Sequence, residues 1–205
     1  GQCSWLSKHW SGRTNTCGDI TSMNIFHLDK DPILAAQMMC DKHVVKMVTE
    51  YGQMLSTAHR VLDGELYTDK TKNGRNIKRW RLRGAAQEQD LYKASHVNHP
   101  SNIWIRENAA NYRWLFKHFQ ATAKEYEKRY GRVHMTYDKL GGYVWFAPRN
   151  INLVGRLTKF AQAMPEYCKR EDPVEAYRFY YIKEKVDFAR WKNTETPIWF
   201  KEGVA

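Results

Sequence analysis

Hydrophobic residues recur at steps of three and four in three long stretches of this chain, which is the spacing of an amphipathic helix. The stretches cover residues 31–55, 102–130 and 172–192. Asp31–Pro32 has the form of an N-cap followed by proline at the first helical position, and the same pair recurs at Asp172–Pro173. Gly131 is placed to end the second helix. Strand-type alternation is rare, so we predict a mainly α, compact single-domain bundle of about three long helices, joined by long basic and aromatic loops.

The first 22 residues differ from the rest of the chain. They are polar, aperiodic and rich in Gly, Ser and Thr, and Met23 opens a strand-like or turn-like stretch, MNIFHLD. We therefore expect residues 1–22 to be an appended polar segment and residues 23–205 to form one domain. No internal repeat or low-complexity tract divides that domain further.

The first predicted helix carries one acidic residue among its apolar side chains. On a wheel of about 100° per residue, Asp41 falls inside the apolar arc, with Gln37 one turn earlier and His43 at the border. Four polar residues lie opposite that arc: Lys42, Lys46, Glu50 and Gln53. A buried carboxylate must be paired, or its pKa rises, and both states are common at active sites. Asp41 is therefore either structural, in a salt bridge or a loop cap, or the catalytic carboxylate, supported by His43 and Gln37.

The charge of the chain favours a polyanionic partner. Its 33 Lys and Arg against 22 Asp and Glu give a formal charge of +11, a bias shared by nucleic-acid-binding, ribosomal and membrane-surface proteins. Residues 70–83 include seven basic residues and no acid. This loop is either a solvated charge run or a grip for phosphates in which Trp80 stacks, and we favour the grip. Its basic residues are Lys70, Lys72, Arg75, Lys78, Arg79, Arg81 and Arg83.

Other sequence signals point to a cytoplasmic protein without a metal or cofactor. There is no run of 18 apolar residues and no secretory signal. The four cysteines form no CxxC pair, and we interpret them as reduced thiols. The eight histidines form no HxxxH pair, although the HLD at 27–29 could be half of an iron-binding triad.

Several short pieces of the chain resemble the phage pyrimidine-dimer DNA glycosylases of the endonuclease V type. NIFHLD leading into LAAQMM is similar to that family's first strand-like turn and first helix, and NGRNIKRWRL is similar to its basic DNA-contacting loop. NHPSNIWIR resembles the helix entry found in bacterial relatives, and PIWFK resembles the aromatic tail beside the lesion. The pieces follow the family's order along residues 23–203.

The resemblance implies a mostly helical domain that removes a damaged pyrimidine from DNA. Members attack the anomeric carbon of the sugar with the N-terminal amine, assisted by a glutamate on the first helix, and then cleave the strand. Here 22 residues precede Met23, and an ungapped alignment places Val45 where the glutamate would stand, with Asp41 one turn earlier. We therefore expect hydrolysis assisted by Asp41, with little or no strand cleavage.

The resemblance and the charge pattern also predict the DNA contacts. The target nucleotide is expected to leave the stack, while an aromatic side chain fills the gap or sandwiches the base. The candidates for stacking or intercalation are Trp80, Trp104, Trp199 and Phe200. The candidates for DNA binding are Lys42, Lys46, Arg75, Lys78, Arg79, Arg81, Arg83, His99, Ser101, Arg106 and Lys201. Lys42 and Lys46 fit solvated side chains equally well, and His99–Pro100 also fits an ordinary helix-entry turn.

These observations predict a monomeric DNA glycosylase that excises a damaged or modified pyrimidine from double-stranded DNA and leaves an abasic site. Two other functions fit the same sequence. One is a non-catalytic, basic nucleic-acid-binding phage protein in which Asp41 is structural. The other is an enzyme that modifies pyrimidine nucleotides without removing them. Strand breaks after alkali separate excision from mere binding, and release of free base separates it from modification.

Overall fold

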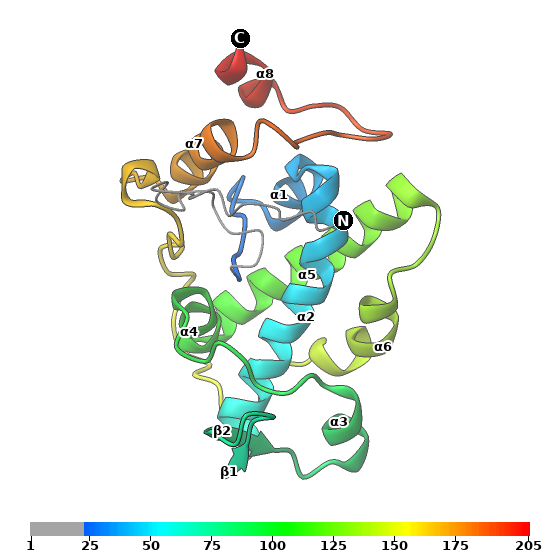
Figure 1. Ribbon diagram of the computed structural model, residues 1–205, viewed down its shortest axis with the longest axis vertical. Helices are drawn as coiled ribbons and strands as arrows, with labels where there is room; N and C mark the ends of the chain where they lie inside the picture. Colours follow the sequence, from blue (N-terminus) through cyan, green and yellow to red (C-terminus); the bar gives the residue numbers. More distant parts are fainter. Residues whose placement is uncertain (1–22) are drawn as a thin grey trace, which may run out of the picture.

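A computed structural model describes residues 23–205 (Figure 1). The appended segment predicted for residues 1–22 lies outside the described residues, as do Cys3 and Cys17. The described chain has eight α-helices, one 3-10 helix and one two-stranded sheet. The helices are α1 (Pro32–Met38), α2 (Asp41–Asp63), α3 (Ala85–Asp90), α4 (Pro100–Glu107), α5 (Ala109–Tyr130), α6 (Met135–Val144), η1 (Glu166–Cys168), α7 (Pro173–Glu184) and α8 (Ile198–Val204), and the strands are β1 (Glu65–Lys70) and β2 (Asn76–Arg81).

Helix α2 is the central element of the fold. It runs through the middle of the molecule and packs against α5, while α4 and α6 lie on either side of it (Figure 1). Val48, Tyr51 and Leu55 of α2 are fully buried, as is Phe119 of α5. Burial of such side chains is the main favourable contribution to folding. The hairpin and α3 lie at the C-terminal end of α2, and α7 and α8 lie at the opposite end of the molecule (Figure 1).

The predicted capping signals are confirmed. The Asp31 carboxylate accepts a hydrogen bond from Ile33 N at 2.7 Å at the start of α1. At the start of α7, Asp172 accepts one from Val174 N at 2.9 Å. Gly131 ends α5 with a φ of 72°, the left-handed conformation that glycine adopts without strain. These three helix ends are therefore determined by local sequence. Cys40 and Cys168 are free thiols, as predicted.

The prediction of about three long helices is wrong, because each of the predicted helices is interrupted or shorter. Met39 and Cys40 are extended and separate α1 from α2. Asn108, with a φ of −160°, separates α4 from α5 and caps α5 by accepting from Asn111 N at 2.9 Å. Helix α7 ends at Glu184 rather than near residue 192. Asp41 is consequently the first residue of a helix, not an interior one.

The basic loop is also different from the prediction, because it folds as a β-hairpin. Strands β1 and β2 are antiparallel, and Gly74 occupies the turn with a φ of 75°. The buried Arg60 of α2 fastens this hairpin to the helix: its guanidinium donates to Trp80 O at 2.9 Å and to Tyr92 O at 2.7 Å. It also forms an ion pair with Glu88 at 2.6 Å. The hairpin is therefore held in a fixed position at the end of α2.

We expect the free energy of unfolding to fall in acid because of His118. This ring is fully buried, with Nδ1 2.8 Å from Pro32 O and Nε2 3.0 Å from the Tyr51 hydroxyl. Burial lowers the pKa of His118 from its ordinary 6.5 to about 4. Between these values the unfolded chain binds a proton that the folded chain does not, so stability is present above pH 6.5 and is lost progressively toward pH 4, by about 3 kcal/mol in total.

Urea unfolding at a series of pH values between 4 and 7 measures this loss. The variant His118→Gln keeps hydrogen-bonding atoms but has no proton to gain. It should show a shallower dependence of stability on pH. His27 and His43, whose pKa values burial also lowers, contribute slopes of the same sign and remain in both proteins. Equal slopes for the two proteins would contradict this assignment.

Candidate active site

Glu50 presents a buried carboxylate in the middle of α2. One turn earlier, Lys46 places its Nζ 2.9 Å from Glu50 Oε1. The Glu50 side chain is only 12% exposed, and its second oxygen, Oε2, is buried without a hydrogen-bond partner among residues 23–205. A buried carboxylate oxygen without a partner is costly, and such groups concentrate at functional sites. Glu50 is therefore the first candidate for chemistry in the structure.

The segment before α1 covers Glu50. Asn24 is anchored there, because its Nδ2 donates to Ala163 O at 2.7 Å and its Oδ1 accepts from the Tyr177 hydroxyl at 2.9 Å. Its backbone amide lies beside the Glu50 carboxyl. Burial raises the pKa of Glu50, while the charge and hydrogen bond of Lys46 and the Asn24 amide lower it. The site therefore holds a carboxyl group whose proton affinity is higher than that of an ordinary glutamate.

The start of α4 contacts the segment before α1. Asn102 Nδ2 donates to His96 O at 2.8 Å and contacts Met23 Sδ at 3.1 Å. The Asn102 Oδ1 and Ser101 Oγ atoms are buried without partners in the described chain. His96 has a φ of 49°, an uncommon conformation for a residue other than glycine, and its charge acts on the pKa of Glu50. The described residues that act on the Glu50 carboxyl are therefore Lys46, Asn24 and His96.

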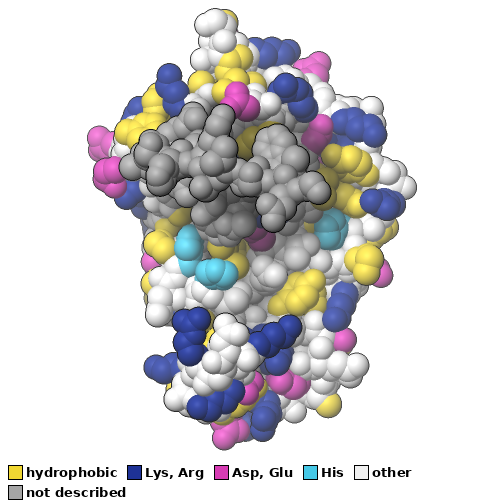
Figure 2. Space-filling model, in the orientation of Figure 1, with side chains coloured by type: hydrophobic (Ala, Val, Ile, Leu, Met, Phe, Trp, Pro, Cys, Tyr) yellow, Lys and Arg dark blue, Asp and Glu magenta, His cyan; other side chains and the backbone are white. Residues whose placement is uncertain are grey.

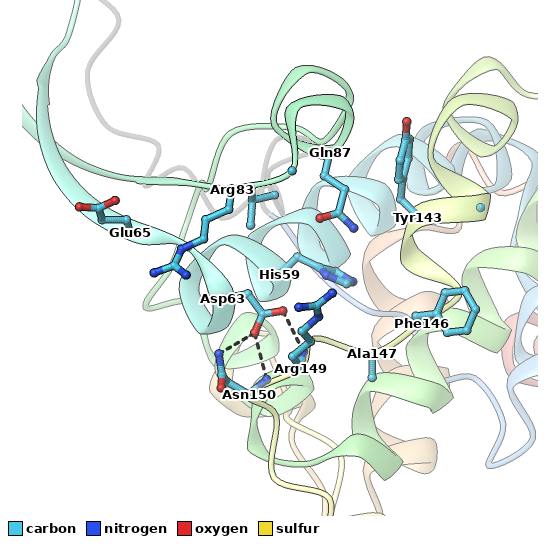
Figure 3. Close-up of a pocket in the computed structure, with 14 residues that line it drawn as sticks. His59, Asp63, Glu65, Arg83, Gln87, Tyr143, Phe146, Ala147, Arg149 and Asn150 are labelled. Atoms are coloured by element: carbon cyan, nitrogen blue, oxygen red, sulfur yellow. Dashed lines mark hydrogen bonds between the residues drawn. The ribbon is translucent and has the colours of Figure 1, made fainter.

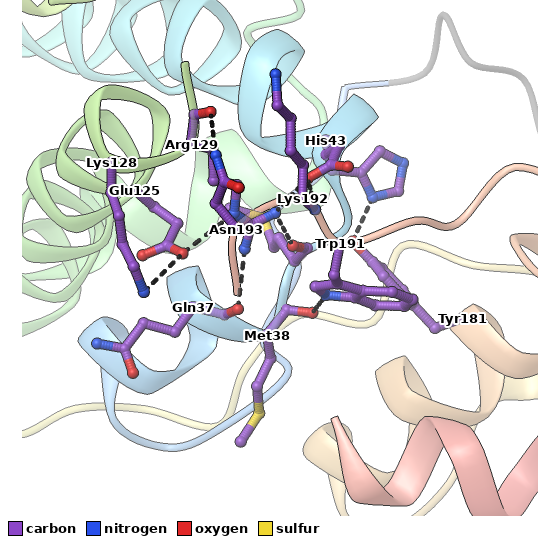
Figure 4. Close-up of polar contacts among 12 residues, drawn as sticks. Gln37, Met38, His43, Glu125, Lys128, Arg129, Tyr181, Trp191, Lys192 and Asn193 are labelled. Carbon is purple, nitrogen blue, oxygen red and sulfur yellow. Dashed lines mark hydrogen bonds and ion pairs between the residues drawn. The ribbon is translucent and has the colours of Figure 1, made fainter. Parts of the chain in front are cut away.

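Asp41, the carboxylate singled out from the sequence, accepts hydrogen bonds from Arg129 and Lys192, both labelled in Figure 4. Its Oδ1 accepts from Arg129 Nη1 at 3.1 Å and from Lys192 N at 2.9 Å. The same guanidinium donates to the backbone oxygen of Gln37 at 3.0 Å. Arg129 therefore links Asp41 to the main chain of Gln37 and not to its side chain. The Gln37 side chain is exposed on α1. The catalytic role of Asp41 stays a prediction, but its carboxylate joins α1, α5 and the segment after α7.

His43 is a buried group rather than an exposed one. Its Nδ1 hydrogen-bonds the Tyr181 hydroxyl (Figure 4). Its ring stacks on Phe26 with centroids 4.2 Å apart. Burial, followed by the charges of Lys185, Lys46 and Lys42, lowers its pKa well below 6.5. His43 is therefore a neutral imidazole at neutral pH.

The predicted DNA-binding residues are spread over several elements. Lys and Arg side chains gather over the hairpin end of the molecule, mixed with acidic ones, and again near α7 and α8 (Figure 2). Arg75 and Lys78 are exposed on the hairpin. Arg79 Nη1 instead donates to Ala94 O at 2.6 Å, and Arg81 lies over the Tyr67 ring at 4.9 Å. Arg83 lines a cavity beside the hairpin. The hairpin thus presents only part of its positive charge freely.

Of the remaining candidates, the lysines are largely exposed and the α4 residues are largely occupied. Lys42 lies 4.8 Å from the Phe188 ring centroid, and Lys201 is exposed on α8. His99 caps α4, with Nδ1 accepting from Ser101 N at 3.1 Å. Arg106 Nη2 donates to Val97 O at 2.8 Å. His99 thus makes the helix-entry turn that the sequence left as an alternative.

Two of the four predicted stacking residues belong to the core. Trp104 is 2% exposed and contacts His27 and Phe160, and Phe200 is 6% exposed and packs on Trp191 at 4.8 Å. Neither side chain offers a free ring face to a base in this conformation, contrary to the expectation, because each lies on the inner side of its helix. Trp80 and Trp199 are half-buried and keep part of their rings accessible.

Two further features bear on the chemistry. In residues 23–205, no group of three or more His, Cys, Asp or Glu side chains is placed to hold a metal ion. No helix of the described chain is long and apolar enough to cross a membrane.

A family model described as pyrimidine dimer DNA glycosylase matches residues 23–138, more than half of the chain. The chain belongs to the pyrimidine dimer DNA glycosylase family. No curated protein and no solved structure matches it.

The part that matches the pyrimidine dimer DNA glycosylases includes Glu50, Lys46, the hairpin and α4, whereas α7 and α8 lie beyond it. Sequence reasoning placed Glu50 on the polar face of the first helix and passed over it. The family's glutamate on that helix could have pointed to it. An ungapped alignment places this glutamate at Val45, and Glu50 is the glutamate five residues later.

Proposed function

We propose that this protein is a DNA glycosylase that excises a damaged or modified pyrimidine from duplex DNA and leaves an abasic site. The observation that carries the proposal is the buried, half-unpartnered carboxylate of Glu50 within the part of the chain that matches the family. The net charge of +11 supports binding of a polyanion.

Glu50 suits the chemistry of breaking an N-glycosidic bond. As that bond breaks, positive charge develops on the deoxyribose ring, and a nearby carboxylate stabilises it. Water adds to C1′, its oxygen becomes the C1′ hydroxyl group, and a proton goes to the departing base. Lys46 keeps the Glu50 carboxyl charged and supplies an ammonium proton close to the reaction. The nucleotide would have to leave the stack to reach this position.

Glu50 is favoured over Asp41 as the catalytic carboxylate, although both lie on α2. Asp41 already shares its Oδ1 between the Arg129 guanidinium and the Lys192 amide. Among the described residues, Glu50 meets Lys46 and the Asn24 amide, and no arginine pairs with it. A carboxylate that stabilises positive charge on the sugar must keep its own negative charge available. Glu50 meets this condition better than Asp41, because no arginine neutralises it.

Incubation with duplexes carrying pyrimidine dimers, oxidised pyrimidines or hypermodified pyrimidines tests the function. We expect free base, identified by mass spectrometry, and strand breaks that appear only after alkali. DNA binding without either product would overturn the proposal in favour of a non-catalytic binder. A modified base that stays attached to the strand would identify a base-modifying enzyme.

The pH dependence of base release should depend on Lys46. Glu50 must be ionised to act, so the rate should rise with pH through the pKa of this carboxyl, which burial raises above 4.5. Lys46→Met removes the group that lowers this pKa, so the midpoint of the acidic limb should move to higher pH. Single-turnover rates between pH 4 and 8 measure the midpoint. Lys139→Met, which alters an exposed lysine of α6, should leave it in place.

We expect little or no covalent trapping of DNA by borohydride. Trapping requires an imine between the sugar and an amine. The main-chain nitrogen beside Glu50 is the Asn24 amide, which is not nucleophilic, and the Lys46 nitrogen is engaged in an ion pair with Glu50. A chain shortened so that Asn24 carries a free α-amine is the informative comparison, because it places an amine at the same point. An adduct formed by the full chain would contradict purely hydrolytic excision.

A further inference from the structure

A cavity of about 1110 Å³ lies at the C-terminal end of α2, apart from the Glu50 site. His59 and Asp63 of α2 form one wall, with Arg83 and Gln87 on the hairpin and α3 side (Figure 3). The segment that follows α6 forms the facing wall. Binding sites for small ligands commonly enclose about 300–1000 Å³, so this cavity has room for a nucleotide with its water.

Two arginine side chains at this cavity are uncommitted. The guanidinium groups of Arg83 and Arg149 both line it, and neither makes a hydrogen bond or an ion pair with a described residue. Asp63 holds the main chain at Arg149, because Oδ2 accepts from Arg149 N at 2.8 Å and Oδ1 from Asn150 N at 3.0 Å (Figure 3). Asp63 therefore fixes the main chain at Arg149, and both of its carboxylate oxygens accept hydrogen bonds from backbone amides.

Among the described residues that line the cavity, Glu65 carries the only other carboxylate. Glu65 is exposed at the start of β1, where solvent screens its charge. His59 contributes no charge: its Nε2 lies 2.8 Å from the Tyr112 hydroxyl, and burial lowers its pKa. The free positive charge at the cavity is therefore that of Arg83 and Arg149.

An aromatic ring lies at the edge of the same cavity. Phe146 is 71% exposed, and the close-up shows its ring beside the cavity (Figure 3). An exposed aromatic ring beside two unpaired arginines offers a face on which a nucleobase can stack. Guanidinium groups match the geometry of phosphate oxygens, and the Gln87 amide supplies a donor and an acceptor for a base edge.

We infer that this cavity binds a nucleoside monophosphate unit, with the phosphate at Arg83 and Arg149 and the base against Phe146. The site is separate from Glu50 and does not depend on base excision. The unit comes either from a strand of the bound DNA or from a free nucleotide.

Calorimetric titration of the full chain with thymidine 5′-monophosphate tests the site. The nucleotide should bind, and 2-deoxyribose 5-phosphate, which lacks the base, should bind at least tenfold more weakly. Arg149→Gln and Phe146→Ala should each weaken nucleotide binding at least tenfold. Arg149→Gln leaves the backbone contact with Asp63 intact, so folding should survive. Arg156→Gln, at an exposed arginine away from the cavity, is the matched control and should bind normally.

Binding of a duplex to the same variants separates the two sources. If the DNA strand supplies the unit, Arg149→Gln should weaken duplex binding and reduce the slope of log affinity against log salt concentration by about one. Normal duplex binding together with lost nucleotide binding would identify a free nucleotide. No nucleotide binding by the unaltered chain, or binding by both cavity variants as tight as that of the unaltered chain, would overturn the inference. Intact nucleotide binding without any base release would count only against the glycosylase function.

Discussion

Replacing Glu50 by Gln should lower the rate of base release by about 10³-fold or more. The amide keeps the shape of the side chain but removes the negative charge that opposes the positive charge developing on the sugar, and loss of one such electrostatic contact has effects of this size. Single-turnover release of free base measures the loss. Duplex affinity should change little, because the substitution lies in the site and not on the basic hairpin.

Asp41→Asn is the control that decides between the two carboxylates. It removes the ion pair with Arg129, but the guanidinium of Arg129 still contacts Glu125 and two carbonyl oxygens. The free energy of unfolding should therefore fall by about 1–3 kcal/mol. Base release by the folded protein should stay within about tenfold of normal, since a lost contact outside the site leaves the transition-state stabilisation of Glu50 in place. A variant that is folded, binds DNA and releases no base would instead place the catalytic carboxylate at Asp41.

Replacing Arg129 by Met should have the largest effect on stability, lowering the free energy of unfolding by about 3–5 kcal/mol. Arg129 is fully buried and forms ion pairs with Asp41 and Glu125, each at 3.1 Å. It also caps the end of α1 through Gln37 O and Met39 O. Methionine fills the space but leaves Glu125, whose side chain is 6% exposed, without its buried partner. Urea unfolding at neutral pH measures the loss.

Arg113→Met provides the comparison on the same helix. Arg113 is exposed on α5, and none of the described residues is its partner in a hydrogen bond or ion pair, so this variant should lose less than about 1 kcal/mol. Similar losses for the two variants would show that the buried network around Arg129 does not hold α1, α2 and α5 together.

The helix ends that could be predicted are those determined by residues next to them in the sequence. Asp31–Pro32, Asp172–Pro173 and Gly131 each act within one turn of the chain, so their signals do not depend on the rest of the fold. The mainly helical class followed from the same local information together with the hydrophobic period.

The break between α1 and α2 could not be predicted because its cause is distant in sequence. No glycine or proline stands at Met39 or Cys40, and the freed carbonyl groups are satisfied by Arg129, 90 residues further along. The hairpin was missed for another reason. Its residues are mostly exposed or half-buried, so they lack the alternation of apolar and polar side chains that marks a strand packed on a core.

Glu50 was passed over because its spacing from Lys46 is that of an ordinary surface ion pair, one turn apart on a helix. Its burial comes from the segment around Asn24, which the sequence could not place over α2. Conversely, Asp41 looked buried because a continuous helix was assumed. Tertiary contacts thus leave the two acidic side chains similarly exposed, Glu50 at 12% and Asp41 at 19%.

Helix α2 sets the distance between Glu50, the proposed catalytic carboxylate, and the basic hairpin that we propose binds DNA. About 20 Å of helix separates Glu50 from Asp63, at 1.5 Å per residue, and the hairpin is tied to that far end by Arg60. This span corresponds to about six base pairs of duplex. An enzyme built this way would hold the DNA to one side of the nucleotide it excises, so its footprint would be lopsided. Adding one helical turn to α2 between Glu50 and Asp63 would shift that footprint by about 5 Å without altering Glu50 or the hairpin.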